Sequence, residues 1–166
     1  MSYDVCLPNY SIGSDCYREI PHFARYYGTK AVVIGGKTAM AKAKPELEKA
    51  LQGSAVTILD YLWFGGDSTY ENGDALIANE TVQQADIIFG VGGGRACDTS
   101  KYVADKLDKP LFTFPTVGSN CASVTAICVI YHRMAVSGNT IIQRSRSTRS
   151  SIPASLRIRL MSCFGR

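Results

Sequence analysis

The chain has 166 residues, of which 46% are hydrophobic and 19% charged, with a formal net charge of +4. That length can form one domain with a real core, and no apolar run approaches the roughly 20 residues of a membrane helix. Residues 132–166 hold seven arginines and no acidic residue, whereas residues 1–131 hold eleven basic and fourteen acidic residues, so the positive charge is poor evidence for nucleic-acid binding by the folded part.

Strand-like and helix-like segments alternate through the first 131 residues. Short apolar runs predict strands, and capping residues with helical spacing predict helices. A glycine-rich loop is expected over 63–69. The predicted strands cover 5–7, 31–34, 55–59, 87–91 and 110–115, and the predicted helices cover 15–27, 38–51, 72–84 and 99–107. This order predicts an α/β fold, a Rossmann-like doubly wound parallel sheet covered on both faces.

The pattern divides the chain into an expected domain over 1–131 and a basic, Ser/Arg-rich tail over 132–166. Residues 144–151 read RSRSTRSS and show no apolar periodicity. Either a disordered tail or a changed reading frame in the gene would produce such a segment.

A run of glycines lies between a predicted strand and a predicted helix. Gly92, Gly93 and Gly94 lack the Cβ atoms that would keep a phosphate away from the backbone, and a helix N-terminus offers unpaired N–H groups. The usual G-x-G-x-x-G fingerprint is incomplete, because Arg95 occupies its last position. With Asp98 four residues beyond Gly94, the pattern favours a nucleotide cofactor over a plain turn.

A second turn follows the strand predicted at 31–34. Its Gly-Gly-Lys-Thr sequence resembles the end of a P-loop, but Ala31 stands where that motif needs its first glycine, so an ATPase is rejected. Gly36 and Lys37 are expected beside the adenosine ribose, where this class of fold usually carries an acid. Since Lys37 suits a 2′-phosphate, NADP stays open beside NAD; the alternative is a turn with a solvated lysine.

A polar loop follows the last predicted strand, where open parallel sheets bind ligands. Thr116, Ser119 and Asn120 suit phosphate or ribose hydroxyls, although a capping loop would read similarly. The isolated histidines, His22 and His132, do not indicate a metal site. Cys97 and Cys121 have no recognisable base, so neither is expected to be a nucleophile. The six cysteines form no C-x-x-C pair, which favours free thiols and a cytoplasmic location.

Three stretches together resemble the iron-containing alcohol dehydrogenase superfamily, in its glycerol dehydrogenase branch. They are Ala31-Val-Val-Ile-Gly-Gly36, the Gly-Val-Gly-Gly-Gly-x-x-x-Asp-Thr-x-Lys run over 90–101, and Phe114-Pro-Thr-x-x-Ser-Asn-Cys-Ala122 leading to Tyr131. The resemblance covers residues 3–131 and implies an NAD(P)-binding domain with Gly94 and Arg95 on the pyrophosphate. It also implies cofactor contacts of Thr116 and Ser119, with Thr125, Ile127 and Tyr131 on the nicotinamide side. Together with the motif residues Gly36, Lys37, Gly92, Gly93 and Asp98, and with Gly94 and Arg95, these are the expected cofactor-binding residues.

The resemblance implies metal-assisted hydride transfer between NAD(P) and a small polyol or alcohol, or its carbonyl. In the family, zinc or iron is held mostly by Asp and His of a second, helical domain, and the enzymes form homo-oligomers. Cys121 stands where glycerol dehydrogenases commonly carry an aspartate near the substrate, so a 2-oxo acid (hydroxycarboxylate) reductase stays open. Further alternatives are a non-catalytic nucleotide-binding module and a nucleic-acid-binding protein that uses the Arg/Ser-rich tail.

The family pattern and the ordinary composition end together after Tyr131, which favours the changed reading frame. We therefore expect this chain to retain no catalytic or metal ligand set and to be inactive by itself. The surface around Phe112, Val124 and Ile127, which in the family should meet the second domain, is expected to face water or the tail. The expected partner is a small-molecule substrate, with no nucleic acid and no membrane.

Overall fold

A six-stranded, wholly parallel sheet forms the centre of the protein. The computed structural model describes residues 10–118, 121–125, 127–132 and 158–162. In this part of the chain the strand order is β1-β6-β5-β4-β2-β3. The strands are β1 (Tyr10–Ile12), β2 (Lys30–Gly35), β3 (Thr57–Trp63), β4 (Ile87–Gly92), β5 (Leu111–Pro115) and β6 (Ile158–Ser162).

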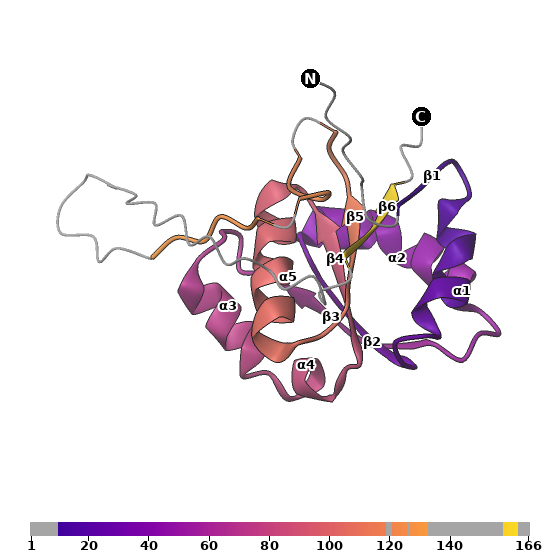
Figure 1. The fold of residues 1–166 in the computed structure, drawn as a ribbon, viewed down its shortest axis with the longest axis horizontal. Helices are drawn as coiled ribbons and strands as arrows, with labels where there is room; N and C mark the ends of the chain where they lie inside the picture. The colour runs from indigo at the N-terminus through magenta and orange to yellow at the C-terminus, as the bar shows by residue number, and fades with distance from the viewer. Residues whose placement is uncertain (1–9, 119–120, 126, 133–157, 163–166) are drawn as a thin grey trace, which may run out of the picture.

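Helices cover both faces of this sheet (Figure 1). The short helix η1 (Cys16–Glu19), α1 (Ile20–Ala24) and α2 (Lys37–Leu51) lie on one face. On the other face lie α3 (Tyr70–Ile77), α4 (Glu80–Gln84) and α5 (Gly94–Leu107). The predicted α/β, Rossmann-like doubly wound sheet is confirmed.

Successive side chains of the central strands point to opposite faces of the sheet, so each face has its own hydrophobic core. Val33 and Phe89 pack with Leu47 on the α2 face. Val32 and Ile88 pack with Val103 on the α5 face. All six of these side chains are fully buried, so the central strands are apolar on both faces, as parallel sheets require.

The direction of winding reverses between β2 and β4. From β2 the chain passes through α2 to β3, at the sheet edge, whereas from β4 it passes through α5 to β5 on the opposite side. Open parallel sheets bind ligands at such a reversal, outside the carboxyl ends of the strands. The turns that follow Gly35 and Gly92 therefore lie at the expected ligand position.

Several predicted boundaries move in the structure. The helix predicted over 72–84 is two helices, because the Asn79 side chain accepts hydrogen bonds from the N–H groups of Thr81 and Val82 and starts α4. The helix predicted from residue 99 begins at Gly94, and the one predicted over 15–27 is replaced by η1 and α1. The strand predicted at 5–7 lies outside the described residues.

Strand β6 arises in the segment predicted to be a tail. It pairs with β5 through Leu111↔Ile158 and with β1 through Tyr10↔Leu160. Residues 133–157 and 163–166 lie outside the described part, so the domain division at residue 131 stays a prediction.

Two further observations bear on the expectations from composition. No helix in the described residues is long and apolar enough to cross a membrane.

Cys16 is disulfide-bonded, so the prediction that all six cysteines are free is wrong at this position. Spacing gives no warning of this bond, because Cys16 stands in no recognisable cysteine motif.

Candidate functional site

The bend between β4 and α5 is built around two glycines. Gly92 has φ +145°, and a Cβ there would lie 2.9 Å from the Cβ of Ala96, so a side chain would strain the bend. Gly93 is the extended N-cap of α5, and its carbonyl accepts the N–H of Cys97 at 3.0 Å. The N–H groups of the first helical turn have no carbonyl of their own helix to bind, which leaves them for a ligand.

A cleft of about 630 Å³ opens at this bend, between the ends of β2 and β4. Its lining includes glycines of both turns and two aromatic residues, Trp63 at the end of β3 and Phe64 directly after it. Predicted site residues that the structure brings together here are Gly36, Lys37, Gly92, Gly93, Gly94, Arg95 and Thr116. The N–H of Thr116 donates to the Gly92 carbonyl at 3.1 Å and joins the third loop to the bend.

The charges at this cleft suit an anion. Among the described residues that line it, Lys37, Lys42 and Arg95 are basic and none is acidic. The Arg95 guanidinium lies 3.5 Å from the Asp67 carboxylate, and the Lys37 ammonium lies 4.4 Å from the centre of the Trp63 ring. Both basic groups are thus held near the helix N-terminus, where an anion is favoured.

A diphosphate fits this arrangement. The bend excludes Cβ atoms, α5 supplies N–H donors, and the basic side chains supply opposite charge. A larger hollow of about 800 Å³ between η1 and α2 shares Ala39, Lys42 and Thr116 with the cleft. Its lining mixes acidic with basic side chains and has no glycine bend, so the cleft is the better anion site.

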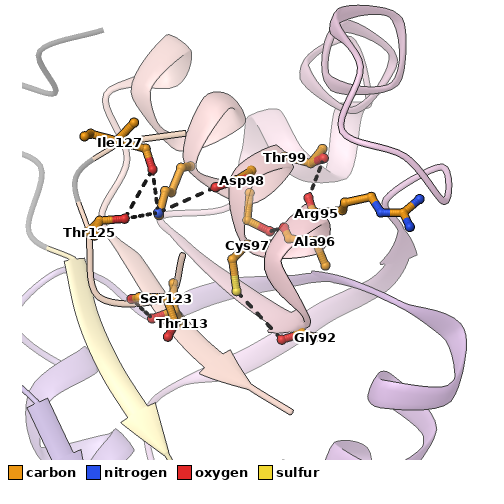
Figure 2. A network of polar contacts seen from close by, with 12 residues as sticks. Gly92, Arg95, Ala96, Cys97, Asp98, Thr99, Thr113, Ser123, Thr125 and Ile127 are labelled. Atoms are coloured by element: carbon orange, nitrogen blue, oxygen red, sulfur yellow. Dashed lines mark hydrogen bonds and ion pairs between the residues drawn. The ribbon is translucent and has the colours of Figure 1, made fainter. Parts of the chain in front are cut away.

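Asp98, Thr125 and Ile127 gather elsewhere, around the buried ammonium of Lys101 (Figure 2). The Lys101 Nζ donates to the Ile127 carbonyl at 2.8 Å and to the Thr125 hydroxyl at 3.4 Å, and lies 3.7 Å from the Asp98 carboxylate. These three predicted cofactor residues are absent from the described lining of the cleft. Their contact with a cofactor stays a prediction.

Burial dominates the titration of this cluster. It raises the pKa of Asp98 to about 6, against the lowering effects of Lys101 and the backbone N–H of Val129. Burial likewise lowers the pKa of Lys101 and raises that of Cys97 to about 12. Cys97 is therefore a neutral thiol at neutral pH.

The remaining predicted residues occupy different surroundings. Tyr131 forms a parallel bridge with Thr69, and its N–H donates to the Ser68 carbonyl at 2.9 Å, so it lies beside the loop after β3. Cys121 is exposed in a turn, and nothing in the structure assigns it a substrate. Ser119 lies outside the described residues.

The expectation that the surface around Phe112, Val124 and Ile127 faces water or the tail is wrong for the Phe112 ring. That ring is fully buried, packed edge-on against Tyr27 and Phe89, because β5 lies inside the sheet. Ile127 is 54% exposed, as expected, and Val124 is half-buried.

Trp63, Phe64 and Asp67 belong to the site but are missing from the predicted set. Trp63 and Phe64 line the cleft, and Asp67 pairs with Arg95. The available signal was their position, since the predicted glycine-rich loop over 63–69 follows a parallel strand next to β2. Only the strand order shows that this loop reaches the same cleft.

No group of three His, Cys, Asp or Glu side chains in the described residues is placed to hold a metal ion. The described part therefore does not fit a metal centre. We derive no metal-dependent step from it.

Comparisons with known proteins point to one family. A sequence profile of that family, iron-containing alcohol dehydrogenase, matches residues 8–151. Glycerol dehydrogenase from Escherichia coli O6:H1 is 27% identical over 122 residues, which is 74% of this chain and 33% of that protein. Glycerol dehydrogenase from Thermotoga maritima is 40% identical over 68 residues, 41% of this chain and 18% of that protein.

Solved structures agree on the fold. Glycerol dehydrogenase from Schizosaccharomyces pombe superposes with a TM-score of 0.70 at 22% identity, covering 97% of this chain and 39% of that one. An iron-containing alcohol dehydrogenase from Thermotoga maritima gives 0.72 at 17% identity, covering 97% and 48%. The chain spans about a third or less of the length of the curated relatives named here.

Proposed function

The chain belongs to the iron-containing alcohol dehydrogenase family, and from that premise we propose that it binds NAD or NADP as the cofactor-binding part of an alcohol or polyol dehydrogenase. The observation that carries the proposal is the Gly92–Gly93 bend. It stands at the reversal of the sheet winding, at the N-terminus of a 14-residue helix, in a cleft lined by basic side chains.

Each element contributes to holding a dinucleotide. The first-turn N–H groups of α5 and the Arg95 guanidinium hold the diphosphate. Gly36 and Lys37 lie at the adjoining strand end, where the adenosine ribose binds in this class of fold. Because Lys37 places positive charge there, the 2′-phosphate of NADP can also bind, so we propose either NAD or NADP as the cofactor.

The nicotinamide, when bound, supplies hydride transfer to or from a small carbon-bound oxygen substrate. The relatives' name, glycerol dehydrogenase, supports a polyol as that substrate. The described residues assemble no metal ligand set, so we propose that they bind the cofactor without supporting turnover. No reduction of NAD above background is expected with glycerol and added Zn²⁺.

Replacing Gly93 by Asp tests cofactor binding, because it should weaken nucleotide binding without lowering the stability of the fold. The backbone conformation of Gly93 is ordinary, φ −83° and ψ −171°, and Asp is a good N-cap. Gly93→Asp should leave the unfolding free energy unchanged or raise it by a few tenths of a kcal/mol. Its carboxylate occupies the N–H donors and repels a diphosphate, so the Kd for NADH or NADPH should rise at least roughly tenfold.

Gly93→Ala is the matched control, since its methyl group makes only ordinary contact, 3.5 Å from the Val117 side chain. Calorimetric titration of the full chain with NADH and with NADPH gives the readout. Failure of the wild-type chain to bind either nucleotide would refute the proposal. Equal affinities for the Gly93→Asp and Gly93→Ala variants would refute the assignment of the diphosphate to this bend.

A further inference from the structure

Lys101 is an unusually placed lysine. Its side chain is 0% exposed, although it sits on an amphipathic helix that has a solvent-facing side. Taking an ammonium out of water is costly, and an apolar side chain of similar volume often serves stability equally well. The retained charge therefore calls for a function other than filling space.

The contacts of Lys101 run to a segment without regular secondary structure. Residues 121–125 and 127–132, which we call the strap, cross beside α5 with no helix and, within the described residues, a single bridge at Tyr131. A segment without a strand ladder must be positioned by other hydrogen bonds. Lys101 supplies two of them, at Ile127 and Thr125, from one ammonium (Figure 2).

Asp98 completes the attachment. Its carboxylate accepts the backbone N–H of Val129 and lies 3.7 Å from the Lys101 Nζ. Two side chains one turn apart on α5 thus hold the strap on both sides of residue 128. Further fixed points of the strap include the Thr113 hydroxyl, which donates to the Ser123 carbonyl, and the Ser68 carbonyl, which accepts the N–H of Tyr131.

The same helix carries the diphosphate site at its first turn. Lys101 lies seven residues from Gly94, which corresponds to about 10 Å along the helix axis. A rigid helix therefore sets the distance between the diphosphate site and the strap residues Thr125 and Ile127. Under the proposed function the adenosine half lies at the end of β2, so the nicotinamide half extends from the diphosphate in the other direction, toward β5. The strap follows β5 in the chain and is hydrogen-bonded to it through Thr113 and Ser123, so it lies on that side.

We propose that Lys101 is a positioning residue that holds the strap, through the Ile127 carbonyl and the Thr125 hydroxyl, in the place where it meets the nicotinamide half of the dinucleotide. This inference rests on the proposed function. It assigns to Lys101 a role in binding the nicotinamide half of the cofactor and no role in binding the adenosine diphosphate half.

Comparing two ligands tests that division. ADP-ribose carries the diphosphate and adenosine but no nicotinamide, whereas NADH carries all three. Lys101→Met keeps the length and removes the charge and the donors. Its Kd for NADH should rise about tenfold, as expected when a charged hydrogen bond is lost, while its Kd for ADP-ribose should change less than about twofold. If the wild type prefers NADPH, then NADPH and 2′-phospho-ADP-ribose replace this pair.

Lys109→Met is the matched control. The Lys109 Nζ also donates to two backbone carbonyls, those of Val82 and Gln83, both at 2.6 Å, but it lies at the far end of α5 from the bend. Its loss should leave the ratio of the two affinities unchanged even if the melting temperature falls. A variant that only loses stability would therefore not show the change in the ratio of NADH to ADP-ribose affinity that is expected for Lys101→Met.

The outcomes separate the two claims. A wild-type chain that binds neither ligand refutes the proposed function, and the role of Lys101 falls with it. A wild-type chain that binds both, with a Lys101→Met variant that loses both equally or neither, refutes only the role of Lys101. Should Lys101→Met not fold, the same ratio measured on Lys101→Leu, which has neither the charge nor the donors, decides in the same way.

Discussion

Arg95 is the side chain whose contribution to the cleft can be measured with least disturbance of the fold. Its guanidinium is 68% exposed and pairs with a 38% exposed Asp67, so the ion pair adds little stability. Arg95→Gln should change the unfolding free energy by less than about 0.5 kcal/mol. It should raise the Kd for the dinucleotide about fivefold, the equivalent of about 1 kcal/mol, and reduce the salt dependence of binding.

Arg25→Gln serves as the control for this prediction, because Arg25 is an exposed arginine that lies over the Tyr26 ring and not at the cleft. Titration at two salt concentrations gives both affinities and the salt effect. An Arg95 variant that binds as tightly as the Arg25 variant at low salt would contradict a diphosphate contact.

Asp98 should make stability depend on pH. Its pKa is raised to about 6 by burial, so between pH 4 and 6 the folded state holds more protons at this site than the unfolded state. The contribution of Asp98 to stability is therefore fully present below about pH 4 and is lost as pH rises to about 6. The facing groups are the Lys101 ammonium and the thiols of Cys97 and Cys128.

Urea unfolding of wild type and of Asp98→Asn over this range isolates the site. The stability of the wild type relative to the variant should fall by on the order of 2 kcal/mol from pH 4 to pH 6 and then stay level. A relative stability that rises with pH would show instead that Lys101 stabilises the ionised carboxylate more than burial opposes it.

At the level of the elements, the break between α3 and α4 depends on one side chain. Asn79 accepts hydrogen bonds from Thr81 and Val82 at 2.9 and 3.3 Å and starts α4. Asn79→Ala should lower the unfolding free energy by about 1 kcal/mol, whereas Asn79→Asp, which keeps an acceptor, should cost a few tenths at most.

Denaturant unfolding of both variants checks this prediction, with dinucleotide affinity as a second measurement that should stay constant. Equal stabilities for the Ala and Asp variants would mean that the turn between the helices, and not the cap, determines where α4 begins.

On the scale of the whole molecule, β6 connects β1 to the rest of the sheet. Because it lies between β1 and β5, the N–H of each interior residue of β6 faces a neighbouring strand. Leu160→Pro removes one of these donors and should lower the melting temperature by roughly 3 °C or more.

The cleft lies at β2 and β4, away from β6, so the same variant should keep its dinucleotide Kd within about twofold of wild type. Thermal unfolding and calorimetric titration test the two halves of this prediction. An unchanged melting temperature would show that β6 contributes nothing to the stability of the sheet.

The sequence by itself determined the central strands, the helices between them and the glycine bend. Strands such as β2 and β4 are buried on both faces, and their continuous apolar runs are a local signal. Gly92 and Gly93 are likewise visible in one stretch, because the strand before them and the helix after them are adjacent in the chain. Gly36 and Thr116 could be assigned to the same site, since parallel strands end at one edge.

Only the tertiary structure decided which residues meet across the chain. Strand β6 depends on pairing with β1 and β5. Trp63 reaches the cleft, and Asp67 reaches Arg95, only because β3 pairs with β2. Lys101 reads in the sequence as an ordinary helical lysine, and its burial exists only because the strap packs beside α5. Periodicity records which face of an element is buried, but it does not record which other segment covers that face.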